Sequence, residues 1–197
     1  DGSAIDGLGG VMVKEVGGLK VALIPVAQDT SPEVSSTGDL KFLPTVDMAV
    51  EAAKAAREGG ADIVVGVVQT NMENDRALMK SHAFDVILSG DDHTYATAYD
   101  GVTAYVETSV DAQLLTPIDL TVEVGEKDGK RTISWTPAFR FIDTATVTPD
   151  PESQALADKF TADMDATLNV EIGTTETAID SRRNVVRAEE ATMGNLI

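Results

Sequence analysis

Two short apolar runs lie close together in the chain: Ile63-Val-Val-Gly-Val-Val68 comes first, and Asp85-Val-Ile-Leu-Ser89 follows it. Runs this rich in aliphatic residues are typical of strands that are buried on both faces. Between them, a short helix is expected from about Asp75 to Lys80. Strands that alternate with helices in this way indicate an α/β fold with a parallel or mixed sheet and right-handed crossovers.

The segment before these strands predicts three further elements. Residues 11–16 and 19–24 are rich in β-formers and flank Gly17-Gly18, which is the pattern of a β-hairpin. A helix is expected from about Val46 to Glu58, with Thr45 as its N-cap and Gly59-Gly60 as its stop. We therefore expect the hairpin's second strand to lie in the same sheet as the strand at 63–68, with this helix as the connection between them.

After His93 the pattern changes to β-rich segments at 103–107, 116–126 and 131–140, with a turn at 127–130. We expect these to be antiparallel strands that close a second layer. Asp150 as N-cap and Pro151 at the first helical position predict a helix whose apolar face repeats at i,i+4 spacing. A β-like segment at 170–179 then begins a new unit.

The charge of the chain limits its partners. Its 197 residues include 33 acidic and 15 basic side chains, for a net charge of −18, and no cysteine. This charge repels phosphate backbones and anionic lipid, so binding to nucleic acid or to a membrane is not expected. A small anionic substrate stays possible, because a metal ion or an arginine pair can reverse the sign of the charge within one pocket.

Polar side chains follow both of the first two buried strands. Ser89-Gly-Asp-Asp-His93 ends one strand, and Gln69-Thr-Asn71 ends the other. Ligands of open α/β sheets bind at the carboxyl ends of strands, and carboxylates with an imidazole suit Mn²⁺, Zn²⁺ or Mg²⁺. If the strands are neighbours, Gln69 faces the Asp-Asp-His cluster. The alternatives are an ordinary Asp-rich turn and a helix-capping loop.

Two motifs in order carry a family resemblance. The first runs from Gly60-Ala-Asp-Ile-Val-Val65 through Phe84-Asp-Val-Ile-Leu-Ser-Gly90 to the Asp-Asp-His, and the second from Asp180 through Val186-Arg187 to Met193-Gly-Asn-Leu-Ile197. Together they resemble the calcineurin-like metallophosphoesterases of the 5'-nucleotidase and 2',3'-cyclic-nucleotide phosphodiesterase family. The resemblance implies a two-layer β-sandwich flanked by helices, of which this chain is a part.

The resemblance also implies metal ligands. His93 matches the last histidine of the family's Gly-His-Asp-His motif, a ligand of the first of two metals, and Asp92 matches its largely structural aspartate. Asp91 and Gln69 stand where the family has histidines on the second metal. Both departures affect the same metal, so the second site is weakened or lost. The family's earlier Asp-x-His and Asn-His motifs have no match here, so no catalytic residue is assigned to this chain. The other histidine, His82, is expected to be a surface residue.

A substrate-binding element is implied at the C-terminal end. Arg183 and Arg187 match positions where the family uses arginine to hold the substrate phosphate, and a guanidinium fork suits that role. The alternative is a solvated turn, salt-bridged to Glu189 and Glu190.

These patterns lead to one functional hypothesis and one alternative. The parent protein is expected to be a metal-dependent phosphoester hydrolase acting on nucleotides, with two divalent ions, exported to the periplasm or secreted. The expected domains are residues 1–147 (the C-terminal half of the catalytic domain), 148–169 (a linker helix) and 170–197 (the start of the substrate-binding domain). The missing N-terminal half is then a partner, and residues 1–197 alone are inactive. The alternative is a degenerate member that kept the fold as a binding or scaffolding module.

Overall fold

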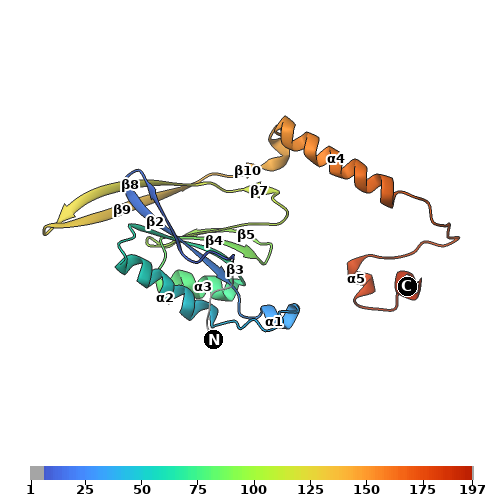
Figure 1. Ribbon diagram of the computed structural model, residues 1–197, viewed down its shortest axis with the longest axis horizontal. Helices are drawn as coiled ribbons and strands as arrows, with labels where there is room; N and C mark the ends of the chain where they lie inside the picture. Colours follow the sequence, from blue (N-terminus) through green and yellow to red (C-terminus); the bar gives the residue numbers. More distant parts are fainter. Residues whose placement is uncertain (1–6, 197) are drawn as a thin grey trace. The chain divides into compact units, whose positions relative to one another are not determined.

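The computed structural model describes residues 7–196, which divide after Val147 into two compact units. The first unit is built on a six-stranded mixed sheet with the strand order β1-β2-β3-β4-β6-β5. Helices lie on one face of this sheet and a long β-hairpin lies on the other (Figure 1). The sheet consists of β1 (Met12–Val16), β2 (Leu19–Ala27), β3 (Ile63–Thr70), β4 (Val86–Asp91), β5 (Tyr95–Tyr99) and β6 (Ala104–Thr108).

The parallel core of the sheet explains the apolar runs. Strands β2, β3, β4 and β6 are mutually parallel, and the edge strands β1 and β5 are antiparallel to their neighbours. Since both faces of a parallel strand are covered, nearly every residue of β3 before Val67 is apolar and buried. The α/β class expected from the sequence is confirmed.

One face of the sheet packs against helices α2 (Thr45–Glu58) and α3 (Met72–Ser81). Two alanines of α2, Ala49 and Ala53, are buried there, which lets the helix approach the strands closely. Phe84 lies in the same core and is 1% exposed. The remaining fully or largely buried members of this core are Ala22, Ile24, Val64, Val68, Leu78, Ile87 and Tyr105.

The other face packs against the hairpin of β8 (Ile118–Lys127) and β9 (Lys130–Phe139). Asp128 (φ 53°) and Gly129 (φ 73°) form its turn, and left-handed residues of this kind match the strand twist in two-residue hairpins. A second, smaller core lies between the layers and contains Ile63, Val65, Val86 and Ala104 of the sheet with Ile118, Leu120, Ile133, Trp135 and Phe139 of the hairpin. The predicted two-layer β arrangement flanked by helices is confirmed.

Asp85 links these layers through one buried carboxylate. It accepts hydrogen bonds from the backbone N–H of Val64 (2.6 Å) and from the indole N–H of Trp135 (3.1 Å). It also pairs with the guanidinium of Arg57 on α2. A helix, the sheet and the hairpin therefore meet at one point, at the end of the sheet opposite the Asp-Asp-His loop.

Several predictions about elements need correction. Strand β6 is not part of the second layer: it pairs in parallel with β4, because Ala104 to Glu107 are buried on both faces like the central strands. Strand β5 was not predicted, because most of its side chains are exposed and its β pattern is short. Thr45 is the first residue of α2 rather than its N-cap, and its hydroxyl exchanges hydrogen bonds with Asp29 instead.

The remaining elements of this first unit are short. Helix α1 (Ser31–Val34) interrupts the loop after β2, and β7 (Leu114–Leu115) pairs with β10 (Ile142–Asp143), which leads into the 3₁₀ turn η1 (Thr144–Thr146).

The second unit begins with the expected helix, α4 (Pro151–Leu168), whose N-cap Asp150 accepts a hydrogen bond from the N–H of Ser153. Two short helices follow, α5 (Arg183–Val186) and α6 (Thr192–Leu196). The predicted β segment at 170–179 is wrong: this stretch forms no strand, because no neighbouring strand accepts its backbone hydrogen bonds. Across residues 7–196, every helix is too short or too polar to cross a lipid bilayer.

Candidate functional site

The carboxyl ends of β2, β3 and β4 meet at one edge of the sheet. The register places Ala27 opposite Gln69, and Thr70 opposite Asp91. The Gln69 amide donates a hydrogen bond to Asp91 Oδ1 at 2.8 Å, and the Gln28 amide donates one to Asp91 Oδ2 at 3.3 Å. The sequence correctly placed Gln69 against Asp91. It missed Gln28, which follows β2 directly and belongs to the same edge only because β2 continues to Ala27.

The loop after β4 has a strained backbone. Asp91 has φ 115° and His93 has φ 57°, and such values cost a non-glycine residue of the order of 1–3 kcal/mol. Contacts on either side hold the loop in this shape. The Asp92 carboxylate accepts a hydrogen bond from the N–H of Met72 at the start of α3, and the N–H of Thr94 donates to Glu107 Oε1 at 3.0 Å. Asp92 is therefore a structural residue here.

His93 differs from the other side chains of this loop. It is exposed, and its imidazole has no hydrogen-bond partner within residues 7–196. In the same part of the chain, no three His, Cys, Asp or Glu side chains gather closely enough to hold a metal ion. The structure thus joins Gln69 to Asp91 and leaves His93 facing outward, so these residues alone do not make a complete metal site. The metal roles of all three stay predictions.

A buried acidic cluster lies beneath the loop. Asp75 is 2% exposed and Glu107 is 1% exposed, and the hydroxyl of Tyr105 lies between them, 2.9 Å from Asp75 Oδ2 and 3.2 Å from Glu107 Oε2. Ser89 and Thr70 also donate hydrogen bonds to Asp75. Burial, and then the neighbouring carboxylates of Asp75 and Glu107, raise the pKa of Tyr105 well above its usual range. Its phenol therefore stays protonated and can donate its single proton to either of the two acids, one at a time.

Replacing Tyr105 by phenylalanine is expected to lower the free energy of unfolding by about 1–3 kcal/mol, because the buried pair of carboxyl groups loses a shared donor that water cannot replace. Urea unfolding of the purified protein measures the change. Tyr99→Phe is the matched control, since the Tyr99 hydroxyl bonds to the Gly101 carbonyl at an exposed site, and its loss should change the free energy by less than about 0.5 kcal/mol. Equal effects of the two variants would contradict a structural role for the cluster.

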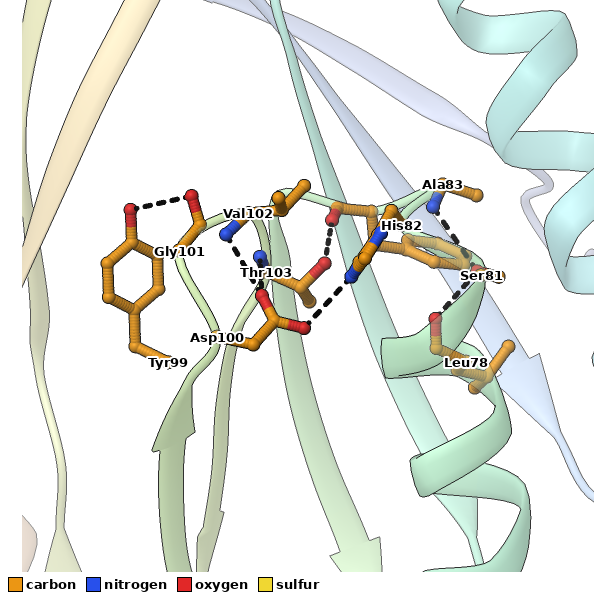
Figure 2. A network of polar contacts seen from close by, with 10 residues as sticks. Leu78, Ser81, His82, Ala83, Tyr99, Asp100, Gly101, Val102 and Thr103 are labelled. Atoms are coloured by element: carbon orange, nitrogen blue, oxygen red, sulfur yellow. Dashed lines mark hydrogen bonds and ion pairs between the residues drawn. The ribbon is translucent and has the colours of Figure 1, made fainter.

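The second histidine lies at the far end of α3. His82 caps the helix with φ 51°, and its side chain is half-exposed, as expected for a surface residue. It nevertheless has a partner, since Nε2 lies 3.0 Å from Asp100 Oδ2 (Figure 2). Asp100 also accepts hydrogen bonds from the backbone N–H groups of Thr103 (2.8 Å) and Val102 (2.9 Å). These N–H groups, with a smaller contribution from His82, lower the pKa of Asp100.

The lowered pKa of Asp100 predicts an acid-dependent contribution to stability. The stabilisation is fully present above the ordinary carboxyl pKa of 3.8 and is lost as the pH falls through the lower value of the folded state. Asp100→Asn should therefore flatten the fall in melting temperature below about pH 4. Asp163→Asn, at an exposed position on α4, should keep the slope of the unmodified protein. Thermal melts between pH 2.5 and 7 measure both, and an unchanged slope for Asp100→Asn would refute this assignment.

The two predicted phosphate-binding arginines lie in the second unit. Arg183 is the first residue of α5 and Arg187 follows its last residue, so the i,i+4 spacing places both on one side of a helical turn. Both are exposed, and neither forms a salt bridge within residues 7–196. Arg182, in contrast, pairs with Asp180 at 2.6 Å. The alternative of salt bridges to Glu189 and Glu190 is therefore absent from this part of the chain.

A groove of about 400 Å³ lies beside Gln69 on the hairpin side of the sheet. Its walls are mainly apolar and include Val67, Leu88 and Leu115, which are 46%, 37% and 55% exposed. Thr116 also lines the groove, and its buried hydroxyl has no hydrogen-bond partner within the described residues. The β8–β9 hairpin thus covers only part of this face of the sheet.

Comparison with solved structures identifies this architecture. A Staphylococcus aureus protein assigned as a 5'-nucleotidase, solved in complex with alpha-ketoglutarate, matches 90% of this chain with a TM-score of 0.63 and 18% identity. SoxB from Thermus thermophilus, described as a sulfate thiohydrolase, matches 87% of this chain with a TM-score of 0.67 and 24% identity. The fold is the calcineurin-like 5'-nucleotidase fold. The resemblance indicated by the two sequence motifs is thereby confirmed.

A sequence relative agrees with the 5'-nucleotidase fold. The trifunctional nucleotide phosphoesterase YfkN of Bacillus subtilis (strain 168) is 25% identical over 191 residues, which cover 93% of this chain. No protein-family model matches the chain. This chain spans 13% of the length of YfkN, 37% of the S. aureus chain and 32% of the SoxB chain. It therefore corresponds to a minor part of each of these proteins.

Proposed function

We propose that the whole protein is a metal-dependent phosphoester hydrolase that acts on nucleotides, and that this chain supplies His93 to its metal site. The observation that carries the proposal is the position of His93, exposed and without a hydrogen-bond partner in residues 7–196, on a strained loop at the carboxyl end of β4 in a 5'-nucleotidase fold. The description of the relative YfkN as a nucleotide phosphoesterase supports the choice of substrate class.

The part played by His93 follows from its chemistry. A neutral imidazole is a good ligand for Zn²⁺ and Mn²⁺, and hydrolases use such ions to polarise phosphoryl oxygens and to supply positive charge. The Asp92–Met72 and Thr94–Glu107 hydrogen bonds fix the residues on both sides of His93 and so set the point on the loop from which its side chain projects. The other ligands of this metal would come from parts of the protein outside this chain.

The partly open face of the sheet fits this arrangement. Val67, Leu88 and Leu115 form an exposed apolar surface beside Gln69, and the buried hydroxyl of Thr116 lacks a partner there. We propose that the N-terminal half of the catalytic domain covers this surface. The site would then be complete only in the whole protein, and residues 1–197 alone would be inactive.

The proposed function also assigns a substrate-binding role to the C-terminal end of the chain. Arg183 and Arg187, which lie on one side of a helical turn and are exposed, would hold the substrate phosphate. On this proposal residues 148–169 are the linker helix and 170–197 begin the substrate-binding domain. A periplasmic or extracellular location stays a prediction from the family resemblance.

A binding or scaffolding role is the second candidate. It is favoured by the hydrogen bond between Gln69 and Asp91, because both residues stand at positions of predicted metal ligands and contact each other instead.

Nucleotide hydrolysis by the full-length protein distinguishes these functions, measured as phosphate release from 5'-nucleotides and as conversion of 2',3'-cyclic nucleotides to nucleoside monophosphates. We expect hydrolysis of 5'-nucleotides or 2',3'-cyclic nucleotides with Mn²⁺, Zn²⁺ or Mg²⁺, abolished by EDTA and absent from residues 1–197 alone. If the folded, metal-supplied protein neither releases phosphate from 5'-nucleotides nor opens the ring of 2',3'-cyclic nucleotides while still binding nucleotides, the scaffolding role is correct and the hydrolase is not.

A further inference from the structure

Both oxygens of the Asp91 carboxylate accept hydrogen bonds from amide groups of its own chain. One oxygen accepts a hydrogen bond from Gln69 at 2.8 Å, and the other accepts one from Gln28 at 3.3 Å. The three residues come from the adjacent ends of β4, β3 and β2. The hydrogen bonds therefore tie three neighbouring strands together at the edge that carries the candidate site.

The chemistry of these groups disfavours a metal ion among them. A metal ligand must present a lone pair, whereas both glutamine side chains present N–H donors to Asp91. To ligate a cation, both amides would have to turn their oxygens inward and give up these hydrogen bonds. The set would then offer one negative charge and two neutral oxygens, with no imidazole, which is a weak combination for Zn²⁺ or Mn²⁺.

The backbone of Asp91 indicates what the hydrogen bonds do instead. Its φ of 115° lies in a region that non-glycine residues rarely adopt, and such a conformation persists only where surrounding contacts impose it. The two amide hydrogen bonds are contacts of this kind, since they hold the Asp91 side chain against β2 and β3. Two residues further on, His93 depends on the same loop conformation.

We propose that Gln28, Gln69 and Asp91 form a hydrogen-bonded clamp that holds the β4 loop in place and ligates no metal ion. This proposal rests on the proposed function for the role of His93, which the clamp positions. The metal of the whole protein is then bound on the His93 side of the loop, and the predicted second-metal ligands Asp91 and Gln69 act as positioning residues. At the position predicted for the second metal ion, the hydrogen bonds among Gln28, Gln69 and Asp91 hold the loop without a metal.

The test uses the full-length protein loaded with Mn²⁺ and freed of excess ion. The variants are Gln69→Leu, Asp91→Asn and Gln28→Leu, and Gln113→Leu serves as a glutamine control whose side chain makes no hydrogen bond in the described residues. Metal content per chain is counted by elemental analysis, and the melting temperature is recorded with and without EDTA. The clamp predicts an unchanged metal count in every variant. It also predicts a lower melting temperature, by a few degrees, in the three clamp variants with or without EDTA.

A loss of one metal ion per chain in Gln69→Leu or Asp91→Asn, with His93 intact, would overturn the proposal, because the two residues would then be ligands. A drop in melting temperature that vanishes in EDTA would overturn it as well. Neither readout requires activity. If the unmodified protein hydrolyses no nucleotide but passes both tests, the proposed function fails and the clamp stands.

Discussion

Replacing His93 by alanine is expected to reduce nucleotide hydrolysis by the full-length protein at least about 100-fold. The imidazole is exposed and has no hydrogen-bond partner within residues 7–196. Loss of a metal ligand removes several kcal/mol of charge stabilisation, where about 1.4 kcal/mol corresponds to a factor of ten in rate. The measurement is kcat/KM for phosphate release at saturating Mn²⁺, together with metal content.

The chain offers a matched control for this prediction, because it contains only two histidines. His82 lies at the C-terminus of α3 and bonds to Asp100, away from the carboxyl ends of the strands. His82→Asn, which tolerates the left-handed backbone at φ 51°, should leave kcat/KM within about twofold. If His93→Ala retained full activity and full metal content, the β4 loop would not be part of the site.

The largest expected effect on stability comes from Phe84→Ala. Phe84 is 1% exposed, and its ring fills the space over Gly66 so closely that a Cβ at Gly66 would lie 3.2 Å from it. Truncation should lower the free energy of unfolding by about 3–5 kcal/mol, because the rigid sheet and helices cannot close the cavity. Chemical denaturation of the purified protein measures this loss.

The control for Phe84→Ala is another phenylalanine in a different setting. Phe160 on α4 is 59% exposed, so Phe160→Ala should change the free energy of unfolding by less than about 0.5 kcal/mol. A loss below 1 kcal/mol for Phe84→Ala would show that the helix layer does not depend on this ring for its packing.

Local sequence patterns predicted the parts of the fold that depend on local physics. The apolar runs of β2, β3 and β4, the glycine turn of the first hairpin and the Asp150–Pro151 start of α4 follow from burial, turn geometry and capping. The placement of β6 did not follow, because pairing with β4 is a long-range choice. The β-like segment at 170–179 was wrong, because β propensity forms a strand only where a partner strand is available.

The candidate site was predictable from the sequence only where its residues directly follow an apolar strand that was itself predicted. His93, Asp91 and Gln69 were found because each follows an apolar run, and the neighbouring strands do bring Gln69 to Asp91. Gln28 and Glu107 were not found, because they reach the site through tertiary contacts over 63 and 13 residues of sequence. The Gln69 side chain could present either its oxygen to a metal ion or its N–H group to a carboxylate. The hydrogen bond to Asp91 decides this, and the local sequence around Gln69 does not.

Anomalous X-ray scattering from crystals of the full-length protein grown with Mn²⁺ tests the central claim most directly. The account predicts a manganese peak at coordination distance from a ring nitrogen of His93, with the remaining ligands from the rest of the protein and no peak bound to Gln69 or Asp91. A manganese site held by Gln69 and Asp91, or an ordered His93 with no metal beside it in an active enzyme, would contradict the account.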